Sequence, residues 1–360
     1  MRSPNDVDFW RGFALVTIFI DHVPGIVFEN LTLHNFAISD AAELFVFLAG
    51  WSLRLLASSR SRPRDTRALF LRLEGRALTI FIAQIVITEV ALAITAAGAL
   101  YFDNPLILEW NNAAATFQSP VETHIGLVLL SHQLFYFDIL PLYVVLMACA
   151  PAIVLMHRRL PKLLLPLSLA IYGITLTFGF NIPTWPLEGR WFFNPLAWQL
   201  VFVLGFVLAG KTGIGGWARS HLPALRWFAV PVALAGIVVG VTHYAPDPLS
   251  LPEPHLFLMF DKTFESPARI IHLLALVVVC RSLFPLLHRN IPRLTGFLSM
   301  LGRNSLQVFC IGSILSLCGQ LARFAFDGTM LCDILVVVIG ITTMSATAWL
   351  VEWRDRYEAA

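Results

Sequence analysis

The sequence predicts an all-α polytopic integral membrane protein with about ten transmembrane helices and both termini in the cytoplasm. Hydrophobic residues make up 57% of the 360 residues and charged residues only 13%, whereas soluble domains carry about 25% charged residues. The apolar residues form long runs, and a helix needs roughly 20 of them to cross the hydrocarbon core. This composition excludes a water-soluble enzyme and a disordered protein. The net charge of +2 is too small for a nucleic-acid partner.

Ten apolar runs are separated by polar breaks, and each is predicted to form one span. The alternation of about ten residues that marks membrane strands is absent, so the spans are expected to be helices. We place them at 8–28, 40–58, 77–100, 134–157, 163–180, 195–210, 226–243, 267–288, 296–322 and 330–351. The first run lacks a small-residue cleavage site, so we expect it to remain as an anchor. One membrane domain, 1–360, accounts for the chain.

Lysine and arginine predict the orientation, because basic loops stay in the cytoplasm. With ten spans, the basic clusters 54–76, 158–162, 211–226, 289–303 and 354–356 fall on one side. The first of them contains Arg54, Arg60, Arg62, Arg64, Arg67, Arg72 and Arg76. Both termini are therefore expected in the cytoplasm and the loops 101–130, 181–194 and 244–266 outside. Aromatic residues of these outer segments, such as Trp110, suit an interfacial belt.

Three ionisable residues of the first span should face the bundle interior or a wet cavity, because charges are costly in lipid. Arg11 lies near the cytoplasmic end, and Asp21 and His22 lie in the outer half. Eleven residues are about three helical turns, so Arg11 and His22 point the same way roughly 16 Å apart. Arginine binds phosphate and histidine transfers protons, so the pair suits a long phosphorylated donor. The alternative is an interfacial arginine and a hydrogen-bonded core histidine.

The second span opens with Asp40 and Glu43, which have the spacing of a capping box. Glu43 alternatively faces inward near the level of His22. The fourth span is expected to begin at His132, with His132 and Tyr136 on one helix face.

Together with Gln133 and Asp138 these residues form a candidate acceptor site on the outer side. The alternative is an aromatic belt with one structural aspartate.

Polar residues also open three later spans. Asn194 is expected to cap the sixth span, and Gln199 follows it. Arg269 and His272 open the eighth span, where an arginine fork suits an acyl carboxylate or a structural ion pair.

Arg303 and Ser305 open the ninth span near the cytoplasm, where they contact a nucleotide or cap the helix. No His, Cys or acidic cluster has metal-ligand spacing, so no metal is expected.

Several segments resemble the OpgC family, which modifies osmoregulated periplasmic glucans with succinyl groups. The similar segments are 8–12, 19–24, 39–50, 132–143, 193–199, 269–275 and 302–309, in the same order. The family is similar to the wider acyltransferase-3 group, whose signature is an arginine and a histidine separated by ten residues in the first span. Arg11 and His22 match this spacing. Asn304 stands where the family pattern often has histidine.

The resemblance implies ten spans in the bacterial inner membrane and a lipid bilayer around them. It also implies acyl-CoA, such as succinyl-CoA, as cytoplasmic co-substrate and a periplasmic glucan as acceptor, with no permanently bound cofactor. His22 is the expected general base, with Asp21 and Glu43 as further catalytic candidates. Arg11, Arg303 and Ser305 are expected to bind the coenzyme A thioester.

The expected substrate-binding residues are Asp40, His132, Gln133, Tyr136, Asp138, Asn194, Gln199, Arg269 and His272. Two alternatives stay open. One is the same chemistry with acetyl-CoA and another envelope polysaccharide. The other is a transporter or exporter of glycans, since intramembrane charges and prolines are equally typical of transporters.

Overall fold

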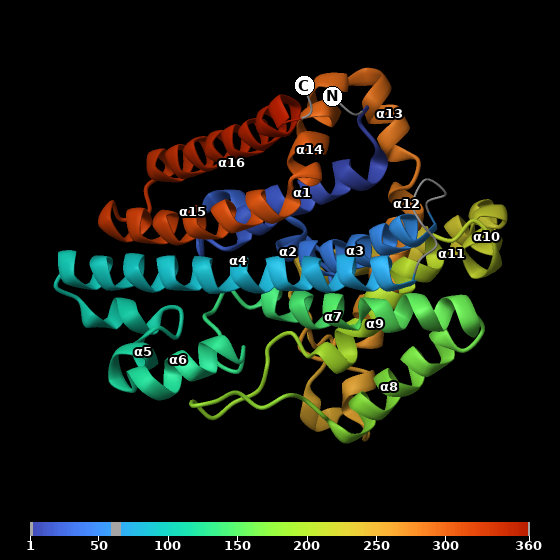
Figure 1. Ribbon diagram of the computed structural model, residues 1–360, viewed down its shortest axis with the longest axis horizontal. Helices are drawn as coiled ribbons and strands as arrows, with labels where there is room; N and C mark the ends of the chain where they lie inside the picture. The colour runs from blue at the N-terminus through green and yellow to red at the C-terminus, as the bar shows by residue number, and fades with distance from the viewer. Residues whose placement is uncertain (1–2, 59–65, 359–360) are drawn as a thin grey trace.

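The computed structural model describes residues 3–58 and 66–358 and confirms the all-α prediction (Figure 1). Helices account for 76% of the structure, and no strand occurs in its described parts. The predicted basic residues Arg60, Arg62 and Arg64 lie outside the described residues.

Sixteen α-helices follow one another through the described ranges. They are α1 (Asp6–Asp21), α2 (Leu33–Phe36), α3 (Ala41–Ser58), α4 (Thr66–Tyr101), α5 (Ala114–Gln118), α6 (Pro120–Val128), α7 (Ile139–Arg159), α8 (Leu164–Phe178), α9 (Pro195–Leu208), α10 (Gly213–Ser220), α11 (Leu222–Val241), α12 (Pro267–Cys280), α13 (Leu283–Asn290), α14 (Pro292–Arg303), α15 (Ser305–Ala325) and α16 (Met330–Glu358). Short 3₁₀ helices lie at Val27–Leu31, Pro105–Glu109, Pro248–Ser250 and His255–Phe257.

Six of the described helices, α3, α4, α7, α11, α15 and α16, are long and apolar enough to cross a membrane. Two bent pairs raise this to as many as eight spans, with bends of 70° between α9 and α10 and 44° between α12 and α13. The protein is therefore a membrane protein by the length and composition of its helices. Ten spans stay a prediction, because α1 and α8 have only 16 and 15 residues.

Several predicted boundaries differ from the structure: α4 begins at Thr66 and not at 77, and the predicted span 267–288 is broken between α12 and α13. The first helix ends at Asp21 and not at 28, because Pro24 and Gly25 follow, and Gly25 turns the chain at φ +74°. The fourth predicted span begins as a helix only at Ile139. The predicted span 296–322 is broken between α14 and α15 at Asn304, whose side-chain amide donates to the Met300 carbonyl at 2.9 Å. A side chain that bonds to the backbone in this way competes with helix continuation.

Glycine allows α1 to lie very close to the helices around it. A Cβ at Gly302 would collide with the Asp8 carbonyl oxygen, and one at Gly12 would collide with the Leu298 carbonyl oxygen. The α3 and α9 helices approach equally closely, with Gly50 facing Phe202. Small residues of this kind let membrane helices pack backbone against backbone.

We therefore expect Gly302→Ala to destabilise the protein by roughly 1–3 kcal/mol, because the new methyl group must push α14 away from α1. Thermal unfolding in detergent measures the loss. The matched control is Gly296→Ala in the same helix, where an added Cβ would meet nothing within 4 Å. Alanine there should be neutral or stabilise by up to about 1 kcal/mol. Equal effects of the two changes would contradict close packing at Gly302.

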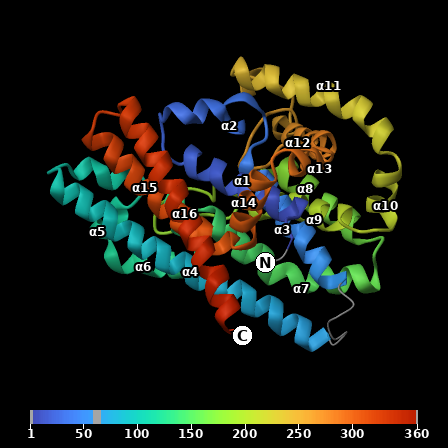
Figure 2. The same cartoon turned by 90° about the horizontal axis from the view of Figure 1, so that it is seen from above.

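The α1 helix packs against α3, α14 and α15, whereas α10 and α11 form an arc around the outside of α12 and α13 (Figure 2). The start of α1 and the end of α16 lie towards the same end of the structure (Figure 1). An even number of crossings requires this arrangement. Which membrane side this end faces stays a prediction. The opposite end of α1 carries His22.

Candidate active site

A cavity of about 480 Å³ lies where α1 ends. Asp21 and His22 line it from α1, and Tyr136 lines it from the segment before α7. Asp40 and Lys262 line it from the start of α3 and from the loop before α12. The volume lies within the usual range for small-molecule sites, and its lining combines aromatic rings with a few polar groups.

His22 is the residue that ends α1, and its ring is held by packing and not by hydrogen bonds. The His22 and Tyr136 ring centroids lie 5.0 Å apart. The Gln320 side chain fixes the backbone by donating to the His22 carbonyl oxygen at 2.7 Å. Buried Nδ1 of His22 has no partner among the described residues. The described residues therefore do not form the hydrogen-bonded core histidine that was the alternative interpretation of the sequence.

Tyr136 reaches the cavity from a turn and not from a helix. The prediction that His132 and Tyr136 share a helix face is wrong, because α7 begins only at Ile139. Tyr136 has φ +69°, a strained conformation for a large side chain. Strain of this kind persists only where the surrounding structure imposes it, and it is often found at functional sites.

The other residues predicted in this segment are buried near it. His132 and Asp138 are 3% and 8% exposed, and Gln133 donates to the Leu130 carbonyl oxygen at 2.9 Å. None of the three is among the residues that line the His22 cavity. Their contact with an acceptor stays a prediction.

The start of α3 forms the predicted capping box. Asp40 accepts from the Ala42 amide at 2.9 Å, and Glu43 accepts from the Asp40 amide at 3.0 Å. Glu43 also faces inward, as the alternative interpretation expected, because it accepts from Arg269 Nε at 2.8 Å. It is fully buried.

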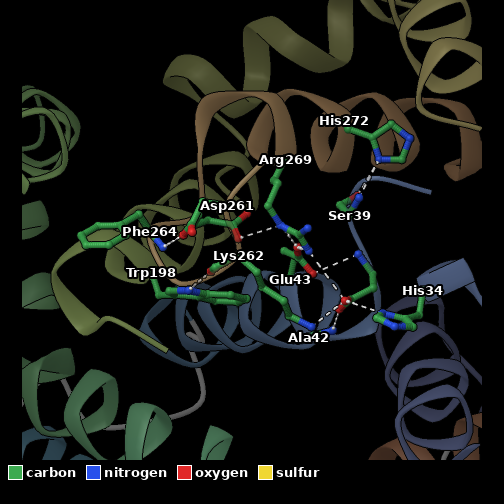
Figure 3. A network of polar contacts seen from close by, with 12 residues as sticks. His34, Ser39, Ala42, Glu43, Trp198, Asp261, Lys262, Phe264, Arg269 and His272 are labelled. Carbon is green, nitrogen blue, oxygen red and sulfur yellow. Dashed lines mark hydrogen bonds and ion pairs between the residues drawn. The ribbon is translucent and has the colours of Figure 1, made fainter. Parts of the chain in front are cut away.

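A buried network of ion pairs joins this capping box to the loop before α12 (Figure 3). Lys262 Nζ donates to Asp40 Oδ2 at 2.6 Å, and Arg269 lies 3.6 Å from the same oxygen. Arg269 also lies 3.6 Å from Glu265 and donates twice to Glu43. The structural ion pair that the sequence allowed for Arg269 is therefore present. Arg269 is not among the residues lining the His22 cavity, and its contact with substrate stays a prediction.

With one carboxyl group neutral, the two remaining acids of the network match its two permanent cations, Lys262 and Arg269, and titratable His34 lies at the edge. Burial raises the pKa of the Glu265 carboxyl well above its usual range, and the nearby Glu43 raises it further. Burial alone would lower the pKa of Lys262, but Asp40 and Glu43 outweigh it and raise that pKa. The raised pKa of Glu265 favours its neutral form, and the raised pKa of Lys262 favours its charged form. The hydrogen bond of His34 with Asp40 raises the pKa of the His34 ring.

Asn194 caps α9 as predicted, because its side chain accepts from the Leu196 amide at 3.1 Å. Gln199 accepts from the Ser168 hydroxyl at 2.7 Å. His272 Nδ1 lies 2.7 Å from the buried Ser39 hydroxyl. These contacts account for the three predicted residues structurally, and their role in substrate binding stays a prediction.

The predicted donor-binding residues lie towards the other end of α1. Arg11 donates to the Leu48 carbonyl oxygen at 3.3 Å and to the Ser52 hydroxyl. Arg303 pairs with Glu352 at 2.8 Å. The packing of Gly302 on Asp8 places Arg303 and the adjacent start of α15 at the level of Arg11.

In the described ranges, no group of three His, Cys, Asp or Glu residues is placed to hold a metal ion.

A comparison with protein families shows the family of this chain. The sequence model of a family described as OpgC protein matches residues 2–356. The chain belongs to the OpgC family. No curated protein and no solved structure matches it. OpgC membership indicates a membrane acyltransferase.

Several residues of this OpgC-family site, Lys262, Glu265 and His34 among them, were not among the expected site residues. Lys262 lies in a long loop with no spacing signal that ties it to Asp40, 222 residues away. Glu265 precedes Arg269 by four residues, a spacing that favours an ion pair on one helix. That signal was available in the sequence for Glu265, whereas Lys262 required the tertiary structure.

Proposed function

We propose that this protein transfers a succinyl or similar acyl group from cytoplasmic acyl-CoA to a hydroxyl group of a periplasmic glucan. The observation that carries the proposal is the His22 ring, which lines a cavity of about 480 Å³ while its buried Nδ1 has no partner in the described part of the chain. An imidazole in such a position is available for proton transfer.

His22 acts as the general base in this proposal. It accepts the proton of the glucan hydroxyl while the hydroxyl oxygen bonds to the thioester carbonyl carbon. The carbon–sulfur bond then breaks, and His22 returns the proton to the departing coenzyme A thiolate. Asp21 and Glu43 are the further catalytic candidates. Glu43 acts at a distance, since it holds Arg269 and the start of α3 next to the cavity.

The donor is proposed to approach from the Arg11 end. Arg11, Arg303 and Ser305 are the proposed contacts of the coenzyme A phosphates. An apolar hollow of about 430 Å³ supports a passage for the acyl–pantetheine arm. Phe13 is among its lining residues on α1, and it extends to Asp40, which also lines the His22 cavity.

The experiment is a mass-spectrometric comparison of periplasmic glycans from cells with and without the protein. We expect a succinyl mass increment on the glucan only in cells that contain the protein. Purified protein should also bind coenzyme A and release it from succinyl-CoA when glucan is added. An acetyl increment on another polysaccharide would show that acetyl-CoA is the donor and that polysaccharide the acceptor, with the same acyl-transfer chemistry. Glycan movement into vesicles without acyl-CoA consumption would refute the transferase.

A further inference from the structure

A second hollow of about 500 Å³ lies beside the His22 cavity. The two share Pro24 and Tyr136 as lining residues, so Tyr136 is a common wall. The His22 ring is 5.0 Å from this wall. A ligand in the second hollow would therefore be separated from the proposed reacting group by the Tyr136 ring.

We propose that this second hollow binds a sugar unit of the acceptor glucan adjacent to the unit that receives the acyl group. The inference rests on the proposed function and specifies where the glucan chain lies. A glucan occupies successive subsites along a surface, and two hollows with a common wall provide two of them.

The chemistry of the walls fits a hexose. Trp110, Tyr136 and Phe324 supply three aromatic rings, and Gln320 and Asp327 supply polar groups. A hexose presents an apolar C–H face, which packs on an aromatic ring, and hydroxyl groups at its edge. Aromatic walls with a few polar groups are the usual composition of small-ligand sites.

The rings of this hollow are fixed before any ligand binds. Trp110 and Phe324 pack edge to face with centroids 5.3 Å apart, and Phe102 packs on Phe324 at 5.2 Å. Rigid aromatic walls lose little conformational entropy on binding, which favours affinity.

An ion pair and hydrogen bonds hold Arg323, which lines the second hollow, in place. Arg323 pairs with the buried Asp333 and donates to the Gly25 carbonyl oxygen at 2.6 Å. Asp333 in turn accepts from the Val27 amide at 2.9 Å. Arg323 is therefore committed to the protein, whereas the exposed Asp327 carboxylate makes no ion pair or hydrogen bond with the described part of the chain. Asp327 is thus the group that is available to sugar hydroxyls.

The test measures glucan binding without the donor. Full-length protein in phospholipid nanodiscs is titrated with unacylated glucan from cells that lack the protein, and calorimetry gives the affinity. We expect Trp110→Ala to weaken binding about tenfold and Asp327→Asn about threefold. Asp327→Asn also guards against misfolding, because it preserves size at an exposed position. The matched control is Phe326→Ala, whose ring is 66% exposed and does not line the hollow, and it should bind like the wild type.

Acyl transfer by the same samples separates the two proposals. We expect Trp110→Ala to raise the KM for glucan and to keep kcat at saturating glucan. Unchanged glucan binding in both Trp110→Ala and Asp327→Asn overturns the subsite while a transferring wild type keeps the proposed function. Trp110 would then belong to an interfacial aromatic belt. If the wild type transfers no acyl group and Trp110→Ala weakens glucan binding, the proposed function is overturned and the subsite is kept. A wild type that binds no glucan overturns the subsite.

Discussion

His22→Gln should lower the rate of acyl transfer by about 10²–10⁴-fold, the usual contribution of a general base. Glutamine approximates the size of the ring and preserves the contact with Tyr136, but it cannot accept the hydroxyl proton. The measurement is the rate of coenzyme A release from succinyl-CoA in the presence of glucan. Coenzyme A affinity should stay unchanged, because the proposed phosphate contacts lie at the other end of α1.

The matched control is His124→Gln, since His124 is exposed on α6 and does not line the cavity. Its transfer rate should equal that of the wild type. Thermal unfolding of both variants shows whether the protein remains folded. A folded His22→Gln protein with full transfer activity would disprove the general-base role.

Arg269→Ala should destabilise the protein by about 3–5 kcal/mol, the usual cost of removing one partner from a buried ion pair. Glu43 is fully buried and would lose its only cationic hydrogen-bond donor among the described residues. Asp40 would keep Lys262 at 2.6 Å, so the loss is expected to centre on Glu43. Arg269→Lys should be intermediate, because lysine keeps the charge but not the guanidinium fork. Unfolding in detergent measures both changes.

Glu265→Gln is the control within the same network. Burial raises the pKa of Glu265 well above its usual range and favours the neutral carboxyl, so an isosteric neutral amide should change stability little. A large loss with Glu265→Gln would contradict the charge balance of the network. A stable Arg269→Ala protein that fails only in succinyl transfer would instead place Arg269 in contact with the acyl carboxylate.

Local sequence was enough to predict much of the fold. Apolar runs with few charges predict helices directly, and the long helices α3, α4, α7, α11, α15 and α16 confirm them. The start of α3 was predictable because Asp40 accepts from the Ala42 amide and Glu43 accepts from the Asp40 amide, all within one turn. The start of α7 was not, because an apolar run already begins at Leu134, five residues before the helix starts at Ile139. There the chain turns at Tyr136, and surrounding contacts hold it in that turn.

Some residues of the candidate site were likewise predictable from local sequence, and others were not. The pairing of Arg11 with His22 rests on helical periodicity, and α1 runs without a break from Asp6 to Asp21. The sequence placed His22 in the outer half of a span predicted to reach residue 28, whereas the structure ends that helix at Asp21. The sequence did not place Lys262 beside Asp40 or Ser39 beside His272, because these partners are 222 and 233 residues apart.

By itself, the sequence therefore determined the membrane class, the helical architecture and the candidate proton-transfer residue, since each depends on composition or on spacing within a few turns. Only the tertiary structure decided which charges neutralise each other and which side chains line the two hollows. Those outcomes depend on how helices from distant parts of the chain pack. In a buried site, a charge is stabilised by whichever opposite charge that packing brings within a few ångströms.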